Sequence, residues 1–427
     1  MQQFKQCRII ANTTQERPSV MWNKDFTILN YCGDQIEMSK LSHMMLDLSC
    51  RAEHILRTSI LMSLDKEVVD SLLTSCNPSD FREDMSESGK NYSFLTDARS
   101  PSAQDSNLYL LDLFLQHNHA WGMFFHMKTS YKVGEEDPFI WLQPKIQEFF
   151  AGCEEFLQVM GPAVWISSGP PGRGTEASAA KIKNTSYKIR SLSIVDGDLT
   201  FIQQGDKTRS ITGRDKLIAR CVPPVIGRLL IFYLRFVRPL EKFWSITCGY
   251  NRAAYEIDFW VTRGVRWRSE NFSEGLKQET FHYLGCELGI SKWRQVSVSV
   301  TRHILKVDPN VRLGEENLIG DLIYGHGSEV ARLNYAVSST LQDESVLFQR
   351  FIDCCRRWQH FFGLVVYEDA VSPLQKMEQC LERVLSLAEN TNSRLLQIEQ
   401  QQIRLEERQT RLEDKFDKLM NFLASEK

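Results

Sequence analysis

A seven-residue repeat near the C-terminal end constrains this chain more than any other feature of its sequence. Apolar residues recur there over 374–423 with alternating spacings of three and four residues, which is the pattern of a coiled-coil seam. Gln402 and Gln409 occupy seam positions and should weaken the seam while they fix its register. The repeat predicts a coiled coil over 371–427 through which the chain forms a homo-oligomer or pairs with a similar helix. A long amphipathic helix that packs on its own domain is the alternative.

The rest of the chain has the composition of a folded protein with several domains. Its 427 residues are 42% hydrophobic, which is enough for two or three domains with their own cores. The eleven cysteines form neither a C-x-x-C pair nor zinc-finger spacing, so we expect a reduced, intracellular protein without a metal site. The longest apolar run, 225–237, contains two arginines and predicts no membrane span or membrane partner. The sequence lacks the P-loop motif, which excludes that class of nucleotide-hydrolysing motor.

Hydrophobic periodicity predicts a mainly α-helical protein with four regions. A helical N-terminal region covers 1–106 and ends in a polar linker at 77–106, where Ser, Asp, Pro and Gly predict a mobile loop. An aromatic helical block at 107–160 leads into a central domain at 161–370, in which two short strands joined at 196–198 predict a small β-hairpin sheet. The central domain has 28 basic and 22 acidic residues, against 23 and 32 in the remainder. This basic bias is compatible with phosphate binding, although ordinary surface scatter explains it equally well.

Five side chains of the central domain suit the chemistry of a phosphodiester. They comprise an arginine in a glycine-rich turn, a lysine at a hairpin tip, an arginine at a helix start, a histidine after a glycine and a tyrosine nine residues later: Arg173, Lys207, Arg294, His326 and Tyr335. Arginine forks bind non-bridging phosphate oxygens in a bidentate way as charge grows in the transition state. The tyrosine hydroxyl is a candidate nucleophile, and the lysine is a candidate acid for the departing sugar oxygen. Alternatively, the first arginine only pairs with Glu176 on a helix face, and the second only satisfies nearby carbonyls.

The order and spacing of these motifs resemble those of the tyrosine recombinase family, over roughly 144–362. The matching motifs are Arg173-Gly174-Thr175-Glu176 for the first arginine box, 203–207 for the lysine hairpin, Trp293-Arg294-Gln295 for the second arginine box, and Gly325-His326 followed by Tyr335. Crypton-type members of fungal genomes, and the tail of fungal telomere-linked RecQ-helicase proteins, are the most similar versions. The resemblance implies a nuclear DNA-binding protein of a transposable element or of telomere-associated type, with no cofactor. It would cleave and rejoin DNA strands through a phosphotyrosine intermediate.

Three positions depart from the family pattern. Ser291 takes the place of a histidine three residues before the second arginine, and we expect it to cap a helix that begins at Lys292 rather than to move a proton. Gln295 replaces another frequent histidine, and Gln204 is an alternative to Lys207 at the lysine's place. Two other functions therefore stay open, a domesticated and catalytically inactive DNA-binding derivative and a coiled-coil interaction scaffold. The expected fold is a helical N-terminal domain, a tyrosine-recombinase-like α domain with a small β-hairpin sheet, and a C-terminal coiled coil.

Overall fold

The computed structural model describes residues 20–61, 64–100, 108–116, 124–127, 139–204, 217–306 and 341–365. The chain divides into two units, Met1–Val365 and Val366–Lys427, and every described residue belongs to the first. The predicted coiled coil at 371–427 lies outside the described residues and stays a prediction.

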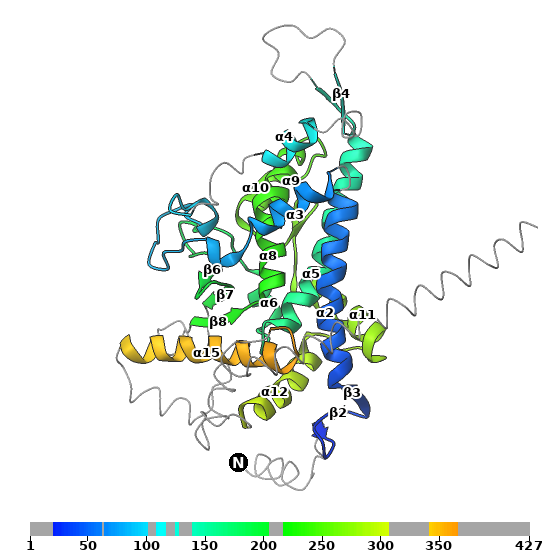
Figure 1. Cartoon of the computed structure of the whole chain (residues 1–427), viewed down its shortest axis with the longest axis vertical. Coiled ribbons are helices and arrows are strands. Elements are labelled where there is room, and N and C mark those ends of the chain that lie inside the picture. The colour runs from blue at the N-terminus through cyan, green and yellow to red at the C-terminus, as the bar shows by residue number, and fades with distance from the viewer. Residues whose placement is uncertain are drawn as a thin grey trace, which may run out of the picture. The chain divides into compact units, whose positions relative to one another are not determined.

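The described part of the chain is mainly α-helical, as its sequence predicts, and two long helices lie at its centre. Helices α2 (Met38–Ile55) and α5 (Gln143–Ser167) run side by side, with α8 (Pro224–Phe232) against both (Figure 1). The second half of α5, 159–167, is buried at every position, because a helix that is apolar all round has to be surrounded by other elements. This helix leads directly into the glycine-rich turn that carries Arg173.

The remaining helices pack around this centre and share one hydrophobic core. They are α3 (Lys66–Thr74), α4 (Tyr109–Gln116), α6 (Gly174–Ser178), α9 (Arg238–Trp244), α10 (Arg252–Ile257), α11 (Ser269–Leu284), α12 (Ile290–Lys306) and α15 (Leu341–Phe361), with π-helical turns at Leu56–Ile60 and Tyr233–Val237 and 3-10 turns at Pro78–Asp80 and Phe94–Thr96. The largest cluster of buried apolar side chains extends from Leu29 to Phe362. The regions predicted as 1–106, 107–160 and 161–370 all contribute to it. Among the described residues, no helix combines the length and the apolar character that crossing a bilayer requires.

Small antiparallel sheets accompany the helices in the described ranges. The strands are β1 (Val20–Trp22), β2 (Ile28–Tyr31) and β3 (Asp34–Glu37) in one sheet, β4 (Phe125–Met127) with β5 (Phe139–Trp141), β6 (Leu192–Val195), β7 (Asp198–Gln204) and β8 (Leu217–Cys221) in a third, and β9 (Val261–Thr262) with β10 (Val265–Arg266). No parallel pairing occurs within this part of the chain. Mainly α with small antiparallel sheets is therefore the observed class.

Two helical predictions for the first half of the chain differ from the structure. The N-terminal region contains the β1–β2–β3 meander, whose last turn places Cys32 and Gly33 at positive φ, as two-residue hairpin turns require. The block predicted as helical over 107–160 is interrupted by the β4–β5 pair, in which Phe125 lies opposite Trp141. Strands of three or four residues are too short for periodicity to separate them from helix.

The polar linker predicted at 77–106 is fixed along 83–91 by buried side chains from another segment. Arg190 forms an ion pair with Glu83 in which both side chains are almost completely buried. The Asn184 amide donates to the carbonyl oxygens of Glu87 and Gly89, each at 3.0 Å. Because buried polar partners hold this stretch from inside, it differs from the mobile loop that its composition predicts.

The predicted hairpin sheet of the central domain is confirmed and gains a third strand. Asp196 and Gly197 form its tight turn at positive φ, and β8 pairs with β7 from Cys221 opposite Thr200 to Leu217 opposite Gln204. Helix α15 lies along β8 (Figure 1). The Gln359 amide donates to the Cys221 carbonyl at 2.9 Å and the Arg356 guanidinium pairs with Asp198 at 3.0 Å. Sheet β6–β7–β8 and helix α15 are thus joined by polar contacts as well as by packing.

Candidate functional site

Arg173 and Arg294, which lie far apart in the sequence, line one open pocket of about 500 Å³. The starts of α6 and α11 contribute one side of this pocket, and the outer face of α12 contributes the other. Its remaining lining residues are Gly174, Ser269, Glu270, Ser273, Ile290, Ser291, Gln295 and Val298. The pocket is lined by two guanidinium groups and one carboxylate, so its chemistry favours an anion.

The glycine-rich turn places Arg173 at the start of α6 because its glycines allow close packing. A Cβ at Gly172 would lie 2.7 Å from Gln203 Oε1 and 2.7 Å from Glu176 Oε2, so any larger residue would have to displace these two side-chain ends. The Arg173 backbone N–H donates to Glu176 Oε2 at 2.9 Å, and this carboxylate in the first turn closes the end of the helix. The turn therefore has one conformation in which the Arg173 side chain leaves toward the pocket.

The Arg173 guanidinium also lies near the same carboxylate. Nη1 is 3.8 Å from Glu176 Oε1, which is longer than the roughly 2.7–2.9 Å of a charge-assisted hydrogen bond. Both side chains are partly exposed, with 27% and 20% accessible. A partly exposed pair at this distance contributes only about 0–1 kcal/mol to stability. The purely structural ion pair between Arg173 and Glu176 is therefore formed, but it adds little to the stability of the fold.

Helix α12 presents Arg294 to the pocket because its opposite face is buried. Trp293, Val296 and Val300 are fully buried, which leaves Ser291, Arg294 and Val298 on the pocket side at spacings of three and four residues. The predicted role of Ser291 as a helix cap is wrong, since α12 begins at Ile290. Ser291 instead stands in the first turn, exposed, with its hydroxyl in the pocket.

Gln295, which stands where the family often has histidine, contacts the N-terminal sheet. Its side-chain Oε1 accepts a hydrogen bond from the Tyr31 hydroxyl at 2.9 Å. Further along α12, the Trp22 indole donates to Ser299 at 3.0 Å, and His303 stacks on Phe26 with ring centroids 4.3 Å apart. Neighbouring residues of one helix thus serve two purposes, since Arg294 lines the pocket and Gln295 anchors β2.

Arg220 is a contributor to the site that the sequence reasoning missed. It lies on β8, is 5% exposed, and donates from Nε to the Pro170 carbonyl at 2.7 Å. Its Nη1 donates to Gln203 on β7. Arg220 therefore fastens the glycine-rich turn to the sheet, and it acts on Arg173 through the backbone. The available signal was a single arginine inside an otherwise apolar strand, which normally indicates a buried partner.

Lys207, His326 and Tyr335 lie outside the described residues and stay predictions. The β7–β8 ladder, which flanks the segment that contains Lys207 in the sequence, ends with Gln204 opposite Leu217. The other two belong to the segment between α12 and α15, and these two helices pack against each other.

Cys221 and Cys354 are packing groups rather than nucleophiles. The hydrogen bond to Cys355 and burial raise the pKa of the Cys221 thiol well above its ordinary value. Burial likewise raises the pKa of Cys354, and a thiol with a raised pKa is inert. Within the described ranges, no group of three or more His, Cys, Asp or Glu side chains is arranged to hold a metal ion.

No known family model matches the chain, and no solved structure matches it. Its function has to be inferred from these residues and their geometry.

Proposed function

We propose that this chain is a nuclear, DNA-binding tyrosine recombinase-like protein in which Arg173 and Arg294 hold the phosphodiester that is cut. The observation that carries the proposal is the pocket that both arginines line. Two guanidinium groups on rigid elements can bind non-bridging oxygens before the reaction and stabilise the extra charge that develops during it. An unrelated pair of surface arginines would have no reason to converge on one pocket.

In the proposed reaction the Tyr335 oxygen attacks phosphorus and forms the O–P bond of a phosphotyrosine. The bond from phosphorus to the departing sugar oxygen breaks, and Lys207 protonates that oxygen. His326 accepts the phenolic proton of the tyrosine. Attack by a sugar hydroxyl on the phosphotyrosine reverses these steps and rejoins a strand. No cofactor or metal enters this sequence of events.

Covalent trapping tests the proposal. The full-length protein should form a denaturant-resistant adduct with a nicked suicide DNA substrate, and Tyr335→Phe should abolish the adduct while binding is retained. Tyr109→Phe, which removes the hydroxyl of a partly exposed tyrosine on α4, is the matched control and should form the adduct normally. An adduct that survives Tyr335→Phe contradicts the assignment of the nucleophile.

An inactive DNA-binding derivative is a second candidate, and Ser291 favours it. A serine hydroxyl in the pocket is a poor proton acceptor at neutral pH compared with an imidazole. Under this candidate the wild-type protein binds DNA in a salt-sensitive manner but forms no adduct on any suicide substrate. Ser291→His is the informative variant, since a gain of adduct formation would identify the missing proton acceptor.

The coiled-coil repeat supports a homo-oligomer, which recombination at paired sites would use. Sedimentation of the full-length chain and of a chain that ends at Ala370 tests this assembly. A lower association state for the shortened chain is expected. Equal states would show that the repeat packs on its own protomer or binds another protein, as the scaffold function requires.

A further inference from the structure

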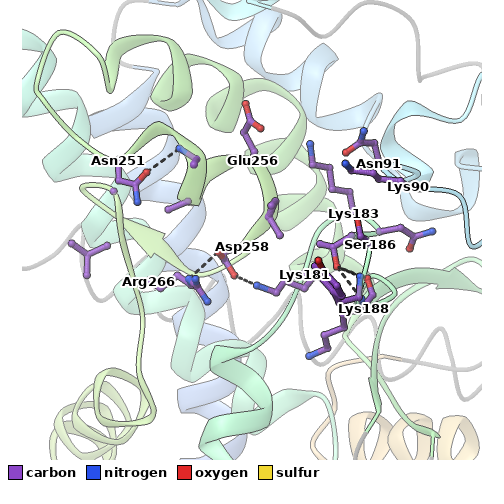
Figure 2. Close-up of a pocket in the computed structure, with 18 residues that line it drawn as sticks. Lys90, Asn91, Lys181, Lys183, Ser186, Lys188, Asn251, Glu256, Asp258 and Arg266 are labelled. Atoms are coloured by element: carbon purple, nitrogen blue, oxygen red, sulfur yellow. Dashed lines mark hydrogen bonds and ion pairs between the residues drawn. The ribbon is translucent and has the colours of Figure 1, made fainter.

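A second, larger concavity of about 960 Å³ is lined by an excess of basic side chains. Its five basic residues are Lys90, Lys181, Lys183, Lys188 and Arg266, and its two acidic residues are Glu256 and Asp258, which leaves a net charge of +3. Figure 2 shows the four lysines gathered on one side of the hollow, with Arg266 and Asp258 toward the other. We call this concavity the lysine groove.

The acidic residues of the lysine groove already have cationic partners. Asp258 is buried and forms ion pairs with Lys181 and, at 3.0 Å, with Arg266 (Figure 2). Glu256 pairs at 2.7 Å with Lys242, which lies outside the groove lining. Burial and the nearby Lys181 lower the pKa of Lys188, so an anion in the groove would relieve an existing repulsion.

The two segments that carry Lys90 and Lys183 are fixed to each other by the buried contacts of Arg190 and Asn184. Besides its ion pair with Glu83, the Arg190 guanidinium donates to the Asp84 carbonyl at 2.7 Å and to the Glu87 carbonyl at 3.0 Å. The Asn184 carbonyl accepts from the Asn91 N–H at 3.0 Å. The backbone segments that carry Lys90 and Lys183 are therefore held together before any ligand arrives, which lowers the cost of binding.

Helix α6 contributes residues both to the two-arginine pocket and to a hollow that adjoins the lysine groove. This hollow of about 380 Å³ is lined by Ser178, Ala179, Arg266 and Arg268, among others. Arg266 also lines the groove, while Arg173 and Gly174 at the other end of α6 line the pocket. The five residues of α6 span about 7 Å along the helix axis. Two phosphates of one strand cover roughly the same distance along the axis of a DNA duplex.

We propose that the lysine groove holds the sugar–phosphate backbone that flanks the phosphodiester bound by Arg173 and Arg294, so the occupant is a nucleic-acid strand. That this strand is DNA rests on the proposed function. A row of phosphates is the ligand that matches cations spread over the two-arginine pocket and the lysine groove. Tyr187 lies fully exposed on the groove lining and offers a stacking surface for an unpaired base.

The test uses the full-length protein and a double variant that removes the charge of two groove lysines, Lys90→Gln with Lys183→Gln. Lys40→Gln with Lys145→Gln is the matched control, because it removes the same charge from two lysines that line none of the described concavities. Fluorescence polarisation with a DNA duplex is measured across a salt series. The groove variant should bind roughly tenfold or more weakly at low salt, and its slope of log K against log salt should be shallower by about 1.8, for two lost phosphate contacts. The control variant should match the wild type in both.

A second variant tests the stacking surface. Tyr187→Ala should weaken binding of a duplex with a single-stranded flank by roughly fivefold or more, while blunt duplex binding changes little. Competition with a polyglutamate peptide of equal charge tests the class of occupant. Displacement of DNA by the peptide at equal concentration would overturn the assignment to nucleic acid.

The outcomes separate this proposal from the proposed function. If the wild type forms a Tyr335 adduct and the groove variant binds with wild-type affinity and salt slope, the groove assignment fails and the function stands. If the groove variant loses binding and no protein forms an adduct, the groove assignment stands and catalysis fails. If the wild type binds no nucleic acid at low salt, both fail.

Discussion

The ion pair between Glu83 and Arg190 allows a quantitative prediction about what holds the lysine groove together. The two side chains are 3% and 1% exposed, and removal of one partner from a buried pair costs about 3–5 kcal/mol because the other charge stays buried. In Glu83→Ala, Arg190 keeps acceptors in the Asp84 and Glu87 carbonyls and in the Asn184 amide. We therefore expect a cost near the lower limit, about 3 kcal/mol, near neutral pH.

The reverse change, Arg190→Met, should behave differently with pH. Burial raises the pKa of Glu83, and Arg190 opposes that rise, so loss of the guanidinium raises the pKa further. A carboxyl whose folded pKa lies above its unfolded pKa contributes stability at low pH, and this contribution is lost as pH rises through the folded pKa. The cost of Arg190→Met should thus approach about 5 kcal/mol at pH 8 and shrink by pH 5.

Urea unfolding followed by tryptophan fluorescence at pH 5 and pH 8 measures both costs. The double variant Glu83→Leu with Arg190→Met should cost less than either single change, because no charge is then left buried. A cost of Glu83→Ala below about 1 kcal/mol, which is the range of an exposed pair, would refute the reasoning. So would a cost of Arg190→Met that does not change with pH.

Three further predictions concern the pocket and the segment beside the groove. Arg294→Ala should weaken DNA binding roughly tenfold or more and Arg294→Lys by less, because lysine retains the charge but lacks the bidentate guanidinium. Arg302→Ala, on the same helix but outside the pocket lining, is titrated as the control, and equal effects of Arg294→Ala and Arg302→Ala would contradict a pocket role. Gly172→Ala should destabilise the protein by about 1–3 kcal/mol, because its Cβ would lie 2.7 Å from two side-chain oxygens; an unchanged urea midpoint would show that the turn relaxes freely. The hydrogen bond from Arg99 holds the pKa of Asp97 well below its ordinary value, so the stability that the Asp97 carboxylate contributes is present above about pH 3.9 and is lost as pH falls toward the folded pKa. The difference in stability between wild type and Asp97→Asn should therefore shrink below about pH 4, and a constant difference would contradict the lowered pKa.

The elements that the sequence predicts well are those whose signal is local. Helix α5 has a long apolar pattern, and the β6–β7 turn has an Asp-Gly pair that tolerates positive φ. The β1–β2–β3 meander and the β4–β5 pair were missed because each strand has only three or four residues, so their stability comes from partners elsewhere in the chain. A strand as short as β6 was identified because the Asp-Gly turn that follows it is a local signal of its own.

The candidate site could be predicted only in part for a similar reason. Arg173 and Arg294 were singled out by motif order, and their shared pocket depends on how α6, α11 and α12 pack. The contacts of Arg220 with Pro170 and of Arg190 with Glu83 join residues that are distant in sequence. A buried polar network has no period along the chain, so single-sequence reasoning offers no means of pairing its members.

Helix α12 also makes the pocket and the N-terminal sheet thermodynamically linked. Arg294 lines the pocket, and the adjacent Gln295 accepts a hydrogen bond from the hydroxyl of Tyr31 on β2. An anion bound in the pocket restrains α12. The sheet then loses less conformational entropy when it docks on the other side of the same helix, so the two contacts are positively coupled without any change of shape. Amide hydrogen exchange in β2 should therefore slow when the pocket is occupied, and the protection of a strand that never touches the ligand becomes a reporter of binding.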